Sequence, residues 1–288
     1  MRFGICPTPR PWWESKKQLH DWVREVEKLG YDAIFLPDHC MLPMVTNELV
    51  DTWITHSHIA AITEHVRLGS NVSPLPRYYP SYLAKMLASV DYLSNGRIIV
   101  GLGAGGVPDE FINYSPSFDP PAVRVNKFIE GVEIMLKLWS EDKVTYNGKY
   151  YKLKDAVLLP KPVQKPHPPL WSGCLGNRML KVTAKYFDGW LFPRLVPGAF
   201  LPFQEYEKRV NIIKKNAEEY GRDLSKFTFA VLGSINDPPE VIEEFKNAGC
   251  TYYLVELFKG PGLSNPYPAS EYIHVTEKFA KEIIPSFT

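Results

Sequence analysis

The sequence predicts an α/β fold, a single TIM (β/α)8 barrel that takes in residues 1–288. Three observations lead to this prediction: short apolar runs alternate with amphipathic segments, the alternation repeats eight times, and a chain of 288 residues suits eight such units. Alternation of this kind indicates a parallel sheet, and eight units favour a closed barrel over an open sheet. Because no shift in composition marks a boundary, we expect one domain.

Eight short runs are the expected strands. Ala33–Pro37 is apolar throughout, which is typical of a strand buried on both faces. The remaining strands are expected at Arg2–Cys6, Val66–Val72, Ile98–Gly103, Leu170–Gly173, Gly189–Phe192, Phe227–Leu232 and Tyr252–Glu256.

Helices are expected between these strands. The first should begin after an N-cap at Ser15 and end at Gly30, with apolar residues at helical spacing between them. The others are expected at Asp51–Thr63, Ser81–Leu93, Val123–Trp139, Arg178–Phe187, Phe203–Tyr220, Pro239–Asn247 and Ser270–Ile284. We expect no helix directly after residues 101–106, because Val107-Pro108 and a turn-rich segment follow them.

A long insertion, Lys143–Pro169, separates the fourth and fifth expected strands. It contains Tyr-Asn-Gly-Lys-Tyr-Tyr at 146–151, where Asn-Gly between aromatic residues predicts a β-hairpin. Five prolines then predict an extended segment up to the fifth strand.

The composition is that of an ordinary globular protein. Lys and Arg number 33 and Asp and Glu number 32, so the net charge is +1, which argues against a nucleic-acid or acidic-membrane partner. No apolar run approaches the roughly 20 residues of a membrane-spanning helix. The four cysteines are far apart and form no CxxC pair, so we expect free thiols in a soluble, cytoplasmic protein.

In a barrel of this type, chemistry takes place where the strands end. Asp38 and His39 follow the second strand, and a histidine beside an acid can donate a hydrogen bond or move a proton near neutral pH. A purely structural histidine is the alternative. His56, His58 and His65 are expected at the surface, and no metal site is expected.

Two glycine-rich loops also follow expected strands. Residues 101–106, Gly-Leu-Gly-Ala-Gly-Gly, satisfy GxGxxG, but without a following helix they favour close backbone approach to a flat ligand over a dinucleotide site. Residues 172–178, Ser-Gly-Cys-Leu-Gly-Asn-Arg, open a helix and could bind an anion, with Arg178 or Arg194 adding charge. An ordinary turn is the alternative. Trp12 and Trp13 could roof an apolar substrate pocket or plug the barrel mouth.

Four stretches together resemble one family. They are LGYDAIFLPDH (29–39), LASVDYLSNGRIIVGLGAG (87–105), YNGKYYKL (146–153) and LPKPVQKPHPPLWSGCLGNRMLKVTAKYFDGW (159–190). The chain resembles the bacterial luciferase-like monooxygenase superfamily, and within it most closely the branch that uses the deazaflavin coenzyme F-420. Flavin mononucleotide (FMN) is the sister option. The resemblance implies a TIM barrel, which the strand count predicts separately.

The resemblance also implies roles for particular residues. His39 would be the catalytic residue, and Asn71-Val72 would form a non-prolyl cis peptide behind the ring. The implied cofactor-binding residues are Asp38, Asn71, Val72, Ala104, Gly173, Cys174, Gly176 and Asn177. Cys174 stands where a second glycine is common. Sugar-phosphate dehydrogenases of this branch carry a glutamate where this chain has Gly106, which argues against that reaction; Asp109 and Glu110 lie nearby.

The resulting hypothesis is an oxidoreductase that transfers a hydride between coenzyme F-420 and a small organic substrate. An FMN-dependent monooxygenase that uses reduced flavin and oxygen is one alternative, and a non-catalytic flavin-binding protein is another. A hydrolase would need paired carboxylates, for which Asp38 and Glu256 are the obvious candidates. A homodimer is the family expectation.

Overall fold

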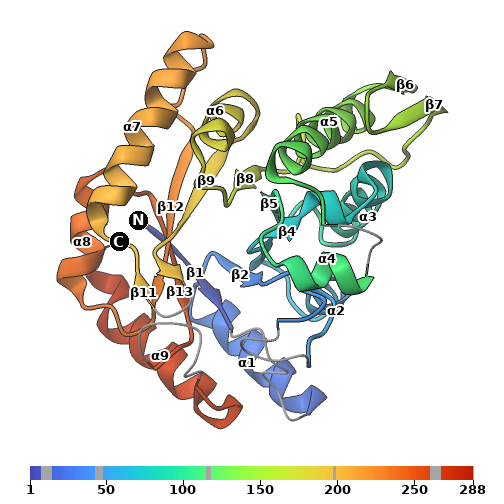
Figure 1. The fold of residues 1–288 in the computed structure, drawn as a ribbon. Coiled ribbons are helices and arrows are strands. Elements are labelled where there is room, and N and C mark those ends of the chain that lie inside the picture. Colours follow the sequence, from blue (N-terminus) through green and yellow to red (C-terminus); the bar gives the residue numbers. More distant parts are fainter. Residues whose placement is uncertain (8–14, 43–47, 115–117, 197–198, 260–266, 288) are drawn as a thin grey trace.

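A computed structural model describes residues 1–7, 15–42, 48–114, 118–196, 199–259 and 267–287 of the chain. In these residues, parallel strands close into a barrel in the order β3-β2-β1-β13-β12-β9-β8-β5, and β3 pairs with β5 to complete the ring (Figure 1). The barrel strands are β1 (Arg2–Cys6), β2 (Ala33–Leu36), β3 (Arg67–Ser70), β5 (Ile98–Gly103), β8 (Leu170–Ser172), β9 (Gly189–Pro193), β12 (Thr228–Ser234) and β13 (Tyr252–Glu256). A two-residue strand, β4 (Ser73–Pro74), adds to β5. The predicted barrel is confirmed.

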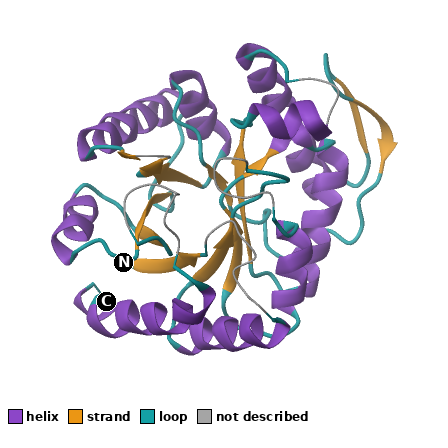
Figure 2. Cartoon of the chain, turned by 60° about the horizontal axis from the view of Figure 1, so that its bottom comes forward, coloured by secondary structure: helices purple, strands orange, loops and turns teal. Residues whose placement is uncertain are grey.

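Helices surround the barrel on its outer side (Figure 2). They are α1 (Lys16–Lys28), α2 (Thr52–Ala60), α3 (Pro80–Leu93), α4 (Pro108–Tyr114), α5 (Pro121–Ser140), α6 (Asn177–Tyr186), α7 (Phe203–Glu219), α8 (Pro239–Asn247) and α9 (Tyr272–Glu282). Short 3-10 turns lie at Leu75–Arg77, Ala269–Glu271 and Ile284–Ser286, and β10 (Leu195–Val196) pairs with β11 (Ala199–Phe200). In the described part of the chain, no helix combines the length and apolarity needed to span a membrane.

Helix α1 begins where the sequence predicts and buries its apolar face. The Ser15 side chain accepts a hydrogen bond from the Gln18 N–H at 3.2 Å and caps α1 at its predicted start. Trp22 and Val26 lie on the buried face of α1, with Leu19 and Val23. The apolar face packs on the barrel, so its burial fixes where the helix lies.

Helix α4 corrects one prediction. The sequence suggested no helix after residues 101–106, but α4 begins at Pro108. Proline is suited to the first turn of a helix, where its missing N–H has no intrahelical partner. Asp109 and Glu110 then place negative charge near the positive end of the helix dipole.

The predicted hairpin is present between β5 and β8. It consists of the antiparallel strands β6 (Val144–Asn147) and β7 (Lys152–Ala156). Glu130 on α5 accepts hydrogen bonds from the N–H groups of residues 149, 150 and 151 at 2.9, 2.9 and 3.2 Å. One carboxylate therefore anchors the turn of the insertion to the outer helix layer.

The barrel interior is filled by side chains. Phe35 stacks on Trp171 with ring centroids 5.5 Å apart and meets Tyr252 edge-on at 6.1 Å. The same buried cluster contains Cys6, Ala33, Ile99, Leu191, Ala230, Leu232 and Leu254. Because the interior is a packed core, a ligand must bind at an end of the barrel.

His56 corrects a second prediction. We expected it at the surface, but it is fully buried, and its Nε2 donates to the Gly69 carbonyl at 2.8 Å. Burial lowers the pKa of His56 to about 4, so the imidazole is neutral near pH 7. Its position on α2 and its bond to β3 make it a structural contact between helix and barrel.

Candidate active site

A cavity of about 470 Å³ opens where the strands end. It is lined by Asp38, His39, Asn71, Val72, Pro74, Gly103, Ala104, Gly105, Gly106, Val107, Glu110, Gly173, Cys174, Leu175, Gly176, Met179, Leu191 and Pro193. The lining includes every proposed site residue that the structure describes except Asn177, which is the exposed first residue of α6. Trp12 and Trp13 lie outside the described residues.

His39 contacts a carboxylate that comes from the α4 segment. Its Nδ1 lies 3.1 Å from Oε2 of Glu110, whose side chain is only 2% exposed, whereas His39 is 23% exposed. The Cys40 N–H donates to the other oxygen of Glu110 at 2.6 Å. Glu110 therefore binds both the ring of His39 and the backbone that follows it.

Arg77 joins this carboxylate to Asp38. Its Nη1 donates to Oε1 of Glu110 at 2.9 Å, and its Nη2 donates to Asp38. The Tyr78 hydroxyl donates to Asp38 at 2.9 and 3.0 Å from the two carboxylate oxygens. We call Asp38, His39, Arg77 and Glu110 the ion network. Its three fixed charges are nearly excluded from water, with exposures of 8% for Arg77, 3% for Asp38 and 2% for Glu110.

The pKa values of Asp38 and Glu110 are shifted in the ion network. Burial raises the pKa of Asp38, and the charge of Arg77 opposes this rise without cancelling it. Burial also raises the pKa of Glu110. The hydrogen bond from His39, the charge of His39, the hydrogen bond from the Cys40 N–H and the charge of Arg77 outweigh this effect and together bring the pKa below its ordinary value. Glu110 is therefore ionised and accepts the Nδ1–H of His39. The other ring nitrogen, Nε2, is the one that does not bind Glu110.

One wall of the cavity is a backbone bulge after β3. The peptide between Asn71 and Val72 is cis, as the resemblance implies. A Cβ atom added at Gly103 or at Gly173 would lie 2.8 Å from a Val72 methyl carbon. These two glycines therefore make room for the protein's own Val72. The sequence interpretation assigned the glycines of 101–106 to close approach of a flat ligand, and Gly103 to Gly106 do line the cavity; room for Val72 is a further reason for glycine at position 103.

Another part of the cavity lining is the start of α6. Gly176 is its N-cap, and a Cβ atom added there would meet no other atom within 4 Å, so the backbone is open at this point. Helix N–H groups and the helix dipole favour an anion at such a terminus. Cys174 is 9% exposed and packs into the outer core, and burial raises the pKa of its thiol. Its side chain thus belongs mainly to the core.

The two arginines suggested as extra anion ligands lie elsewhere. Arg194 donates to both oxygens of Asp237 at 2.6 and 2.7 Å. Arg178 is exposed and bonds the Asn126 side chain at 2.5 Å. Neither lines the cavity, so the predicted charge contribution from them is not present in this arrangement.

Sequence reasoning missed Arg77 and the role of Glu110. Arg77 precedes a Tyr-Tyr pair and follows Pro-Leu-Pro, a context without an evident chemical signature. Glu110 lies 71 positions from His39. The sequence offered one signal: an arginine, Arg77, follows one expected strand, and an acid, Glu110, follows the next. Asp38 is bound to Arg77, and Glu256 does not line the cavity, so the carboxylate pair of a hydrolase is not assembled here.

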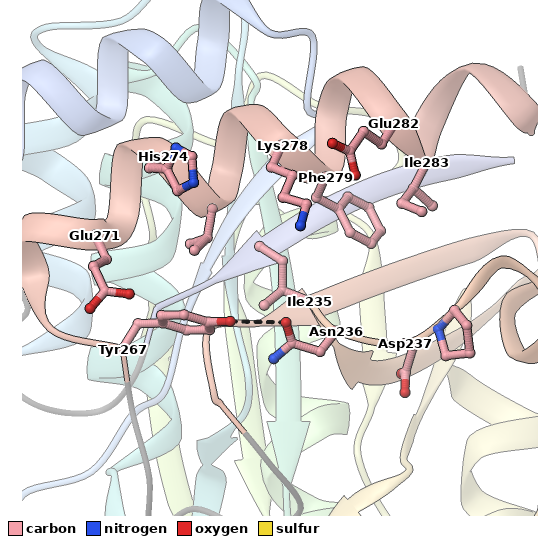
Figure 3. Close-up of a pocket in the computed structure, with 12 residues that line it drawn as sticks. Ile235, Asn236, Asp237, Tyr267, Glu271, His274, Lys278, Phe279, Glu282 and Ile283 are labelled. Atoms are coloured by element: carbon pink, nitrogen blue, oxygen red, sulfur yellow. Dashed lines mark hydrogen bonds between the residues drawn. The ribbon is translucent and has the colours of Figure 1, made fainter.

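A second cavity of about 420 Å³ lies between α9 and the turn after β12 (Figure 3). Glu271, His274, Lys278 and Glu282 border it from the helix side, and the Tyr267 hydroxyl donates to Asn236 at 2.9 Å. No glycine lines it and its histidine has no carboxylate hydrogen bond among the described residues. The cavity at the strand ends is the better candidate.

A glutamate–histidine pair at the carboxyl end of a TIM barrel, lining the same cavity as a helix N-cap, defines an enzyme-type site. The family model for luciferase-like monooxygenases matches residues 1–244. The chain therefore belongs to the luciferase-like monooxygenase family.

Individual relatives are more distant. An F-420-dependent glucose-6-phosphate dehydrogenase of Microbacterium testaceum is 29% identical over 197 residues, which cover 66% of this chain and 56% of the relative. The chain spans between about half and two thirds of the length of the curated relatives it matches.

Two solved structures share the whole fold. A monooxygenase from Streptomyces bottropensis superposes with a TM-score of 0.82 at 20% identity, with all of both chains covered. An F-420-dependent secondary alcohol dehydrogenase in complex with an F-420–acetone adduct gives a TM-score of 0.79 at 21% identity, covering 100% of this chain and 99% of that one. At these identities, the likeness establishes the barrel.

The packing of Val72 predicts a stability effect that can be measured. Gly103→Ala should destabilise the protein by about 1–3 kcal/mol, because the new methyl group would collide with Val72. Val72→Ala in the same chain should relieve much of that cost, so the double variant should be more stable than the sum of the single effects predicts. Chemical denaturation of all four proteins checks this. Strictly additive effects would contradict the proposed contact.

Proposed function

We propose that this protein is an oxidoreductase that transfers a hydride between coenzyme F-420 and a small organic substrate. The observation that carries the proposal is the His39–Glu110 pair, held by Arg77 in the wall of the cavity. It supplies one oriented proton-exchanging group beside a space large enough for a ring system. A hydride-transfer reaction on an alcohol or carbonyl needs such a group.

The cavity fits a phosphorylated deazaflavin. Val72 and Leu191 offer apolar surface for a flat ring, and Ala104 to Gly106 offer backbone without bulky side chains. Leu175 and Gly176 bring the N-terminus of α6 to the same cavity, where a phosphate would meet N–H groups. When bound, the deazaflavin would supply the hydride-accepting or hydride-donating centre.

His39 would manage the accompanying proton. Its Nδ1–H is donated to ionised Glu110, so Nε2 can accept a proton from a substrate hydroxyl or return one to a carbonyl oxygen. The nearby carboxylates stabilise the imidazolium that forms. Asp38 and Arg77 keep Glu110 and the backbone after β2 in place, and they do not themselves need to exchange protons.

The lining of the cavity favours a substrate without a phosphate group. Among the described residues that line it, the ionisable side chains are Asp38, His39, Glu110 and Cys174, and none is Lys or Arg. Among these residues a sugar phosphate would find no cationic side chain. Gly106 also argues against a sugar phosphate, because the sugar-phosphate dehydrogenases of this branch carry a glutamate at that place. We therefore propose an uncharged secondary alcohol, aldehyde or ketone as the substrate class.

An FMN-dependent monooxygenase is the second candidate function. The structural likeness to the monooxygenase of Streptomyces bottropensis favours it, and the same phosphate site would serve FMN. Oxygen reactivity separates the two, because a deazaflavin has carbon at position 5 and reacts poorly with oxygen. A flavin-binding protein without catalysis would have no use for the buried His39–Glu110 pair.

We also propose a cytoplasmic homodimer. The exposed faces of the packed helices α2 and α3 carry large apolar side chains, Ile54 at 71%, Tyr82 at 77% and Tyr92 at 60% exposure. Surface of this kind is typical of a protein interface. The free thiols Cys6, Cys40, Cys174 and Cys250 suit a reducing compartment.

The cofactor preference is directly testable. Fluorescence titration of protein freed of ligand should give tighter binding for coenzyme F-420 than for FMN. Binding of FMN tenfold or more tightly would reverse the order of the two candidate functions. Failure of both to bind would reject the cavity as a flavin-type site.

The phosphate site can be tested at Gly176. Gly176→Asp should weaken cofactor binding by at least tenfold, because it adds bulk and negative charge at the open start of α6. Gly176→Ala is the matched control and should stay within a few-fold of the original affinity, since the space around it is empty. An unchanged dissociation constant for Gly176→Asp would mean that the loop is only a turn.

His39 can be tested by separating turnover from binding. His39→Ala should lower kcat by about 10²–10⁴, the usual contribution of a general acid or base, while cofactor affinity changes less than threefold. The assay would use secondary alcohols and aldehydes identified by screening with oxidised and reduced deazaflavin. A purely structural histidine would instead show a lower melting temperature with near-normal turnover in the folded fraction.

A further inference from the structure

Glu256 is a buried acid in the apolar interior of the barrel. It ends β13 and is 4% exposed. Residues two apart on a strand share a face, and Tyr252 and Leu254 on the same face as Glu256 belong to the interior cluster. Glu256 therefore lies in the layer of the barrel interior nearest the end where the active-site cavity opens.

The residues next to Glu256 connect it to residues that line the active-site cavity. In the sheet register it stands opposite Cys6 on β1 and Ser234 on β12. The Cys6 thiol accepts a hydrogen bond from the Asn71 amide at 3.8 Å, and Asn71 lines the cavity. Cys6, Leu191 and Val72 pack in one cluster, of which Leu191 and Val72 are also cavity residues. Glu256 does not line the cavity itself, but Cys6 and Asn71 connect it to the cavity lining.

Few polar contacts offset the burial of the Glu256 carboxyl group. Its Oε2 has no hydrogen-bond partner, and no ion pair with a cation is present among the described residues. Asp237, the charged residue that follows β12, binds Arg194 and the Tyr253 hydroxyl. Cys6 is the titratable neighbour on β1, and burial together with Glu256 raises its pKa. A buried acid with an oxygen that has no hydrogen-bond partner is a candidate for a role beyond packing.

We propose that Glu256 is a positioning residue that couples cofactor binding to a proton: the anionic cofactor binds when Glu256 is neutral and is repelled when it is ionised. The proposal rests on the proposed function, because it takes a phosphorylated deazaflavin as the ligand. The neutral carboxyl group adds no charge. The carboxylate would place a negative charge beside Cys6, whose thiol accepts the hydrogen bond from the Asn71 amide of the cavity lining.

The expected pH dependence follows from this difference. Burial raises the pKa of Glu256 to about 8, so the group is mainly neutral at pH 7. Because the ligand prefers the protonated form, affinity should be constant well below pH 8 and should fall up to tenfold per pH unit above it. Binding at pH 8.5 should take up a proton, and binding at pH 6.5 should not do so through Glu256.

The experiment compares fluorescence titrations of coenzyme F-420 between pH 6.5 and 9.5. Glu256→Gln keeps the shape but cannot ionise, so its affinity should vary less than threefold over the range in which the original protein loses about tenfold. Tyr252→Phe is the control; it removes a buried oxygen from the opposite end of the same strand and should leave the loss intact. A change in affinity caused by protonation of the cofactor itself is the same for all three proteins, so it cancels when they are compared.

Calorimetry on the unaltered protein gives a second measurement that does not depend on folding of a variant. Titrations in two buffers with different ionisation enthalpies should report proton uptake at pH 8.5. Absence of uptake, or an equal loss of affinity with Glu256→Gln, would overturn the coupling. Failure of coenzyme F-420 to bind at any pH would instead reject the proposed function.

Discussion

The site depends on the placement of one guanidinium group between two buried carboxylates. Arg77 binds Asp38 and Glu110 while almost completely excluded from water. Without this cation, two negative charges would remain buried side by side, which is strongly unfavourable. With it, Glu110 can stay ionised and bind the ring of His39. The orientation of His39 is thus set by a residue that does not touch it.

The ion network also ties together segments that the barrel alone would leave independent. Asp38 follows β2, Arg77 lies in the 3-10 turn after β4, and Glu110 lies on α4 after β5. Three consecutive strand-end loops are therefore joined by charge-assisted bonds. Another part of the cavity lining has a different character: an open backbone at Gly176 and a helix N-terminus. In the proposed function, binding of a phosphate and movement of a proton would therefore use separate parts of the cavity lining.

The sequence predicted the fold well because its signals are local. Apolar runs and helical spacing identified all the barrel strands, and Ser15 marked the start of α1 where the structure has it. Helix α4 was not predicted because its seven residues are too few for a periodic pattern. The partners of His39 could not be predicted, since Arg77 and Glu110 reach the site only through tertiary closure. The prediction for His56 was wrong because a helix that is apolar on most sides gives no sign of which face is buried.

The central claim is that Glu110 holds His39 in one tautomer, and ¹⁵N NMR of the imidazole rings tests it most directly. At a pH where the His39 ring is neutral, with its signals assigned by comparison with His39→Gln, the account predicts that Nδ1 carries the proton and that Nε2 does not. Glu110→Gln should disturb this preference, because the ionised acceptor is lost. Observation of the Nε2–H tautomer in the unaltered protein would contradict the account, since Nδ1 could not then donate to Glu110.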